Sequence, residues 1–393
     1  LSLFGLCMAF VVIALGAWTR LVDAGLGCPD WPGCYGFVVF PTSEADVLLA
    51  EQRYPQFPYE IDKAIPEVVH RYFAAFLGLI AIALTVAAFK YKLPLRIKKI
   101  TSFLLFFICC QGIFGYLTVS LKLLPIIVTG HLFGGFTTLS LFFYLYLTSA
   151  DYIKSYQIEH LKPLAALALV ALIVQIFLGV WTSTNYASLA CADFPTCQGS
   201  YLPPMDFANG FNLFQEVGPN YLYGLLDNDA RVAIHYSHRI SAIFVTLIFA
   251  ILVTRLWFSN AAPLASTLGL VLVTQISLGI MNVIYVLPLY IAIAHNLVAA
   301  ALLSIAQCET NRDLAPAYKN ARARPDKPSA PKFTPEAELQ ELKSTQSAFS
   351  FNCTISLTVS SPSSSTEITS GGVNTNADSS NPLNSPPINP WVA

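Results

Sequence analysis

The chain has 393 residues, of which 55% are hydrophobic and only 11% are charged. A soluble domain carries about 25% charged residues, so this composition excludes an ordinary water-facing surface and makes a lipid bilayer the expected solvent. The formal net charge of −1, from 22 basic and 23 acidic residues, offers no basic surface for a nucleic-acid partner.

Eight segments are long and apolar enough to cross a bilayer, which requires about 20 mostly apolar residues. The first could be a signal peptide, but no small-residue cleavage site follows it, and its pattern returns in the middle of the chain. We therefore predict an all-α integral membrane protein with eight transmembrane helices. The expected spans are residues 1–19, 66–89, 101–120, 126–148, 163–184, 231–256, 263–283 and 288–308. Prolines are expected in the first turn of five spans, where they cost least: Pro66, Pro125, Pro163, Pro263 and Pro288.

Basic residues predict the orientation of the spans. Residues 90–99 hold five lysines and arginines and no acid, and the segment after the last span is also basic. Both belong in the cytoplasm, so we expect a bacterial cytoplasmic (inner) membrane protein with both termini inside. The long loops, 20–65 and 185–230, then face outward. Residues 309–393 are rich in Ser, Asn, Pro and Thr, which predicts a disordered cytoplasmic tail.

The first half of the chain, residues 1–150, aligns with residues 151–308. We therefore predict two pseudo-symmetric four-helix bundles of the same orientation, related by an axis along the membrane normal. The matching pieces are Gly16-Ala17-Trp18-Thr19 with Gly179-Val180-Trp181-Thr182, Cys28 and Cys34 with Cys191 and Cys197, His70-Arg71 with His238-Arg239, Gln111 and Gly115 with Gln275 and Gly279, and His131 with His295.

Four histidines lie within this repeat, near the outer ends of their spans. His70 and His131 belong to the first half, and His238 and His295 to the second. Each half thus offers two histidines at similar depth on different helices, as the two axial ligands of a haem iron require. A lone membrane histidine could simply bond a neighbouring helix, but the repeated pairing favours haem. Zinc is disfavoured because no further ligand lies at matching depth.

Charged residues accompany the histidines. Arg71 and Arg239 directly follow His70 and His238; they could pair with haem propionates, or they could be interfacial arginines that reach toward water. Glu67 shares a helix face with His70 and is expected to point into the same cavity as an acid, a base or a stabiliser of positive charge. The alternative is a first-turn carboxylate favoured by the helix dipole.

The halves differ at this position, because His235 stands where the first half has Glu67. The second half is therefore expected to hold a plain electron-transfer haem.

Two cysteine pairs, Cys28 with Cys34 and Cys191 with Cys197, lie in the expected outer loops. Disulfides form and persist on that side of the membrane, and the turn-forming residues between the cysteines allow closure. We expect a disulfide in at least one pair. It could be a staple that holds the loop over a haem pocket, or a redox-active dithiol.

Taken together, these residues resemble the haem A synthase family, in its cysteine-bearing bacterial branch. The resemblance covers about residues 5–308 and excludes the tail. It rests on the following pieces and their second-half counterparts: Gly16-Ala17-Trp18-Thr19-Arg20, the Cys28–Cys34 loop, Glu67-Val68-Val69-His70-Arg71, Gln111 to Gly115, and His131.

The resemblance implies an oxidoreductase that converts a methyl group of haem O to a formyl group, with oxygen from water, to give haem A for terminal oxidases. It implies a haem b between His238 and His295, haem O near His70 and His131, and a catalytic role for Glu67. Haem O synthase, a membrane electron acceptor and the lipid bilayer are the expected partners, and a homo-oligomer is compatible with the sequence.

Three rival interpretations make different demands on the sequence. A dihaem b carrier that oxidises quinol predicts equivalent halves and does not need Glu67. A quinone-coupled thiol–disulfide oxidase uses the cysteine pairs but does not need four matched histidines. A transporter with inverted repeats is disfavoured by the parallel orientation of the halves.

Overall fold

A computed structural model describes residues 1–149 and 158–310, without the side chains of residues 149 and 308–310. In this part of the chain, eight helices are long and apolar enough to cross a membrane. This confirms the prediction of an all-helical, multi-pass membrane protein. Beyond the end of the last helix, the expected tail and its basic segment lie outside the described residues.

The eight long helices agree with the predicted spans to within a few residues. They are α1 (Ser2–Leu21), α3 (Ile61–Lys90), α4 (Leu95–Ser120), α5 (Pro125–Ser149), α6 (Lys162–Thr184), α8 (Asn228–Phe258), α9 (Ala262–Ile284) and α10 (Leu289–Thr310). The long loops hold the short helices α2 (Glu44–Arg53) and α7 (Phe207–Gly210), and the 3-10 turn η1 (Glu159–Leu161) precedes α6.

The start of α3 corrects one expectation. Pro66 does not open this helix but lies inside it, in the second turn, because the helix begins at Ile61. A proline at this position removes one backbone N–H donor from the helix. Its carbonyl oxygen accepts a hydrogen bond from the Thr19 hydroxyl of α1 at 3.1 Å. Pro125, Pro163 and Pro263 lie in the first turns of their helices, and Pro288 directly precedes α10.

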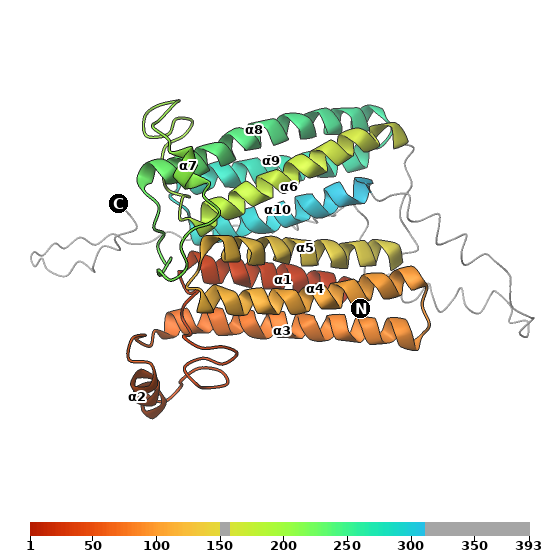
Figure 1. Cartoon of the computed structure of the whole chain (residues 1–393). Helices are drawn as coiled ribbons and strands as arrows, with labels where there is room; N and C mark the ends of the chain where they lie inside the picture. Colours follow the sequence, from red (N-terminus) through yellow and green to blue (C-terminus); the bar gives the residue numbers. More distant parts are fainter. Residues whose placement is uncertain (150–157, 311–393) are drawn as a thin grey trace, which may run out of the picture. The chain divides into compact units, whose positions relative to one another are not determined.

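The long helices form two sets with the same pattern of neighbours (Figure 1). In the first set, α1 and α4 each contact α3 and α5; in the second, α6 and α9 each contact α8 and α10. The sets meet where α1 and α5 contact α10 and where α5 contacts α6. One apolar core runs through both, with Leu139 and Leu172 among its buried residues. Large apolar side chains such as Phe106 and Phe244 remain exposed on the helices, as a lipid-facing surface requires.

The long loops that hold α2 and α7 lie at the same end of the helices, called here the loop end (Figure 1). In the first loop, buried Cys28, Cys34 and Tyr35 pack with Val68 of α3. In the second, buried Cys191 and Cys197 pack with Val232 of α8. Each loop is therefore fixed to the helix that carries one of the predicted ligand histidines.

Candidate functional site

His70 of α3 and His131 of α5 lie close together near the loop end. Their ring centroids are 6.4 Å apart and their planes are inclined by 87°. Among the described residues, the backbones of α3 and α5 do not come close to each other, because α1 and α4 lie between them. The two imidazoles therefore meet across the interior of the first helix set. A metal about 2 Å from one nitrogen of each ring is compatible with this separation.

The second helix set repeats the arrangement with His238 of α8 and His295 of α10. The backbones of these helices also do not come close to each other within the described part of the chain, since α6 and α9 lie between them. The two side chains are close enough for their charges to interact. The Nε2 amide of Gln175 lies 3.1 Å from Nδ1 of His238, and that of Gln275 lies 3.3 Å from Nε2 of His295.

Ring nitrogens remain unpaired at these sites. In the described part of the chain, Nδ1 of His70, His131 and His295 is buried without a hydrogen-bond partner. Buried polar atoms normally have a partner, so these rings retain bonding capacity toward a ligand. The donor set, two imidazoles from opposite helices, fits the axial ligation of a haem iron.

Each of the four histidines also packs against a glycine on a neighbouring helix. A Cβ atom added to the glycine would lie 2.9 to 3.5 Å from Cε1 of the ring, and any larger side chain would displace the histidine. The pairs are Gly16 with His70 (2.9 Å), Gly115 with His131 (3.5 Å), Gly179 with His238 (3.0 Å) and Gly279 with His295 (3.1 Å). The sequence analysis did not assign these glycines a role, although all four belong to the repeated motifs.

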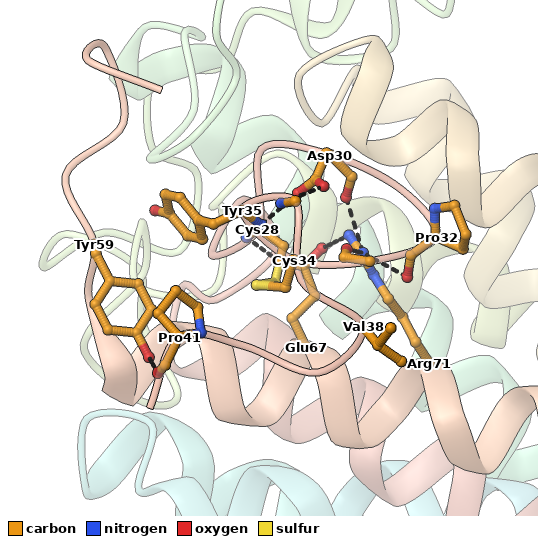
Figure 2. The surroundings of a disulfide bond; sticks show 12 residues. Cys28, Asp30, Pro32, Cys34, Tyr35, Val38, Pro41, Tyr59, Glu67 and Arg71 are labelled. Atoms are coloured by element: carbon orange, nitrogen blue, oxygen red, sulfur yellow. Dashed lines mark hydrogen bonds and ion pairs between the residues drawn. A yellow bond between two sulfur atoms is a disulfide. The ribbon is translucent and has the colours of Figure 1, made fainter. Parts of the chain in front are cut away.

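Glu67 is buried, with 5% of its surface exposed. Its Oε2 accepts a hydrogen bond from the backbone N–H of Cys28 at 2.9 Å, and its Oε1 accepts one from Nη2 of Arg71 at 2.5 Å. Figure 2 shows the carboxylate against the disulfide loop. The sequence pattern predicted that Glu67 shares the cavity of His70; the contacts add the loop backbone as a partner that no sequence pattern indicated.

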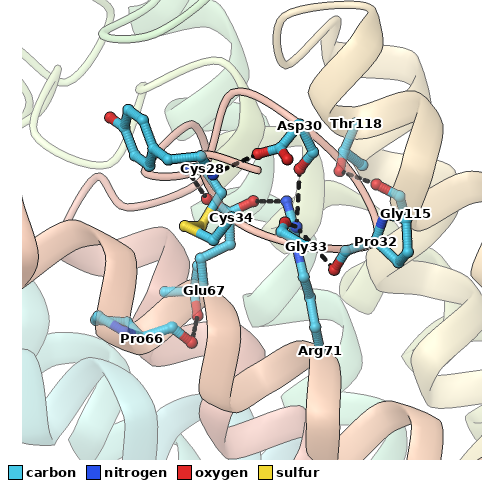
Figure 3. Close-up of polar contacts among 12 residues, drawn as sticks. Cys28, Asp30, Pro32, Gly33, Cys34, Pro66, Glu67, Arg71, Gly115 and Thr118 are labelled. Atoms are coloured by element: carbon cyan, nitrogen blue, oxygen red, sulfur yellow. Dashed lines mark hydrogen bonds and ion pairs between the residues drawn. A yellow bond between two sulfur atoms is a disulfide. The ribbon is translucent and has the colours of Figure 1, made fainter. Parts of the chain in front are cut away.

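The two predicted propionate partners, Arg71 and Arg239, bind the loops. Nη1 of Arg71 donates to the carbonyl oxygens of Asp30 (2.9 Å) and Gly33 (2.5 Å), so backbone carbonyls of the segment between Cys28 and Cys34 surround the guanidinium (Figure 3). Nη1 of Arg239 donates to the carbonyl oxygens of Asp193 and Thr196, both at 2.9 Å. Several N–H groups of each arginine are thus already used by protein atoms, and propionate binding stays a prediction.

Both cysteine pairs form disulfides, which confirms the predicted linkages. The Cα atoms are 4.8 Å apart in Cys28–Cys34 and 4.6 Å apart in Cys191–Cys197. The four cysteines are buried.

An aspartate shapes each disulfide ring, and the sequence analysis missed both. Asp30 accepts hydrogen bonds from the N–H groups of Tyr35 and Gly36. Asp193 accepts them from Gln198 and Gly199. The hydroxyl of Thr196 and then these amides lower the pKa of Asp193 to about 2. Each aspartate lies two residues after the first cysteine of its pair, and this repeated spacing is the feature of the sequence that could have identified them.

An eight-helix membrane bundle with paired, incompletely bonded histidines in two helix sets has the features of a haem-binding membrane protein. Comparison with known proteins agrees with this class. Residues 1–307 match the model of the COX15-CtaA family, described as cytochrome oxidase assembly protein.

Three bacterial haem A synthases illustrate the similarity. That of Shewanella oneidensis is 43% identical over 303 residues, covering 76% of this chain and 91% of that protein. Those of Rickettsia prowazekii and Caulobacter vibrioides are 27% and 26% identical, over 76% of this chain and 92% and 91% of the relatives. The chain therefore belongs to the haem A synthase (COX15-CtaA) family.

Proposed function

We propose that this chain carries out the reaction of its family in the first helix set, with haem O bound between His70 and His131. As a haem A synthase the chain is an oxidoreductase that converts haem O to haem A. The observation that carries the assignment of the site is the buried carboxylate of Glu67, one turn from His70 on α3. The second set has His235 at the matching position.

The chemistry requires a base near the substrate. Oxidation of a methyl group to a formyl group with oxygen from water releases protons and electrons. Glu67 is held by the Cys28 amide and by Arg71, and in our proposal it takes the proton that the attacking water loses. The two histidines orient the substrate, and the loop closed by Cys28–Cys34 limits the access of bulk water.

The second set, in our proposal, holds a resident haem b between His238 and His295. A haem bound there supplies an acceptor for the electrons that leave the substrate. Support comes from Gln175, whose amide contacts His238, because Val12 stands at the matching position of the first half. A permanently bound cofactor benefits from a fixed ligand ring, whereas a substrate must be exchanged.

We also propose that residues 1–150 and 151–308 are the functional halves and that the loop end faces the outside of a bacterial inner membrane. The disulfides of the loop end support this orientation, because they persist in an oxidising compartment. Haem O synthase is the proposed source of the substrate.

The orientation is tested by labelling single introduced cysteines. The cysteine of Phe214→Cys, at a position 93% exposed in a loop of the loop end, should react with an impermeant maleimide on intact cells. Tyr91→Cys, at a position 68% exposed, should react only after permeabilisation; the reverse pattern would exclude this orientation.

The deciding experiment is expression of the chain with a haem O synthase in a host that makes no haem A, followed by chromatography of the extracted haems. Haem A should appear only when the chain is present. A dihaem electron carrier or a thiol–disulfide oxidase would leave haem O unchanged.

The role of Glu67 is tested by Glu67→Gln, which keeps the side-chain size and removes the base. This variant should retain haem b and lose haem A formation. The control is His235→Gln, which introduces the same residue at the matching position of the second half. This variant should still form haem A. Haem A formation by Glu67→Gln at the normal rate would show that Glu67 is not the base.

A further inference from the structure

We propose that Arg71 is a positioning residue that couples the Cys28–Cys34 disulfide ring to the Glu67 carboxylate. In this proposal the closed ring acts on the reaction by fixing where that carboxylate lies. The inference rests on the catalytic role of Glu67 proposed above, and it adds the device that holds Glu67 in place.

The hydrogen bonds that Glu67 accepts from Cys28 and from Arg71 both trace back to one small covalent ring. The ring runs from Cys28 to Cys34 and is closed by the disulfide. Its first residue donates its backbone N–H to Oε2 of Glu67. Two carbonyl oxygens further along it, of Asp30 and Gly33, accept hydrogen bonds from Nη1 of Arg71. Nη2 of the same guanidinium donates to Oε1 of Glu67. Both carboxylate oxygens are thus tied to the ring, one directly and one through Arg71 (Figures 2 and 3).

The ring can act as a brace because it is itself fixed. The carboxylate of Asp30 accepts hydrogen bonds from the backbone N–H groups of Tyr35 and Gly36, which lie just beyond the ring. The hydroxyl of Tyr35 donates to the carbonyl oxygen of Pro58 at 2.9 Å. A disulfide removes conformations from the segment that it closes. Opening it would therefore free the Cys28 amide and the Asp30 and Gly33 carbonyls to move independently.

The second half contains the same clamp without the carboxylate. Arg239 donates to the carbonyl oxygens of Asp193, Thr196 and Cys191. Its Nε donates to Nε2 of His235 at 3.2 Å. The arginine-to-ring contact is therefore a shared feature of both loops. Only in the first half does it also hold an acidic group, so the two halves form a matched comparison.

The first test measures how readily each disulfide is reduced. Thiolates must reach the sulfur atoms, and both pairs are buried, so the rate of reduction reports how often a ring opens. The purified holoprotein is treated with dithiothreitol, and freed thiols are alkylated and assigned by mass spectrometry. Arg71→Leu should speed reduction of Cys28–Cys34 by about tenfold, since charge-assisted hydrogen bonds are lost. Cys191–Cys197 in the same molecules should not change.

Arg239→Leu is the matched control and should give the reverse pattern, with only Cys191–Cys197 reduced faster. An unchanged rate for Cys28–Cys34 in Arg71→Leu would overturn the clamp. This measurement does not depend on haem A formation, so it remains decisive even if the native chain makes no haem A and the proposed function fails.

The second test asks whether Arg71 acts through the ring. Haem A formation is compared for Arg71→Leu, for the double replacement Cys28→Ser with Cys34→Ser, and for their combination. If the arginine and the ring work as one unit, the combination should be no worse than the more damaged of the two variants. Independent, multiplying losses would overturn the coupling.

A positioning role also predicts which quantity falls. In Arg71→Leu the maximal rate of haem A formation should drop, while haem b content and the affinity for haem O stay near native values. Arg71→Lys should restore part of the rate, because it keeps a cationic donor. Loss of haem O binding in step with the rate would instead show a direct role in holding the substrate and overturn the proposal. Arg53→Leu, which removes an exposed cation from the same loop region, is the charge control.

Discussion

At the scale of single residues, the glycines beside the four histidines decide how closely the rings can be held. In Gly179→Ala the new methyl group would lie 3.0 Å from Cε1 of His238. Overpacking of this kind costs about 1–3 kcal/mol, and here the strain falls on a proposed ligand. We expect this variant to bind less haem b and to show altered g values by electron paramagnetic resonance.

The control for this substitution is Gly112→Ala, since Gly112 is exposed on α4 and a Cβ atom there would meet nothing within 4 Å. It should match the native haem b content and spectrum. Gly16→Ala, next to His70, should leave haem b intact and affect haem O. Native haem b content and g values in Gly179→Ala would show that this ring is not tightly confined.

The sequence pointed to the candidate side chains of the site but not to their backbone partners. His70, Glu67 and Arg71 stand out because a membrane span has few polar residues. The Cys28 amide and the Gly33 carbonyl that bind Glu67 and Arg71 could not be predicted, because every residue has such groups and only the loop conformation selects which ones are used.

At the scale of elements, hydropathy located the membrane-crossing segments. It did not show where their helices extend beyond the apolar stretch, and it did not reveal the short helices in the loops. Helix α3 begins five residues before the predicted span, in a segment that includes Asp62 and Lys63. Helix α2 lies wholly in the first long loop, between α1 and α3, where apolar length carries no information. Its start is marked in the sequence by a local signal instead, the capping box between Ser43 and Asp46.

The second long loop, between α6 and α8, has a pH dependence that follows from Asp193. Its pKa is lowered from 3.8 to about 2 by the Thr196 hydroxyl and by the N–H groups of Gly199 and Gln198. A lowered pKa means that the folded loop favours the ionised form, so its stabilisation is complete above the unfolded value and is lost as the pH falls toward about 2. The amides of Gln198 and Gly199 should then exchange faster.

This behaviour is checked by hydrogen–deuterium exchange, corrected for its intrinsic pH dependence. Asp193→Asn should speed exchange at these two amides at neutral pH, and its difference from the native protein should shrink between about pH 4 and about pH 2. Glu216→Gln, in the same loop, is the control and should exchange like the native chain. Equal exchange of Asp193→Asn and the native protein at pH 7 would contradict the role of this carboxylate.

At the scale of the whole molecule, residues that break the repeat join the two helix sets. The guanidinium of Arg20 at the end of α1 lies 3.8 Å from the ring centroid of Tyr186 and donates to the Ser183 carbonyl oxygen at the end of α6. The hydroxyls of Thr129 and Thr184 are 3.0 Å apart and buried. The repeated motifs predicted two similar four-helix halves, but such a repeat does not determine which faces of the two sets meet.

The division of labour between the halves gives a prediction for the whole molecule. If His238 and His295 hold haem b, replacing either with alanine should abolish its reduced-minus-oxidised absorbance, because the iron loses an axial ligand. His70→Ala and His131→Ala should keep that absorbance and fail to make haem A. His160→Ala, in η1, should keep both. The measurements are difference spectra and haem chromatography on the same membranes. Equal loss of haem b absorbance in His70→Ala and His238→Ala would mean that the two sites do not bind their haems independently, and the proposed separation of substrate and cofactor would fail.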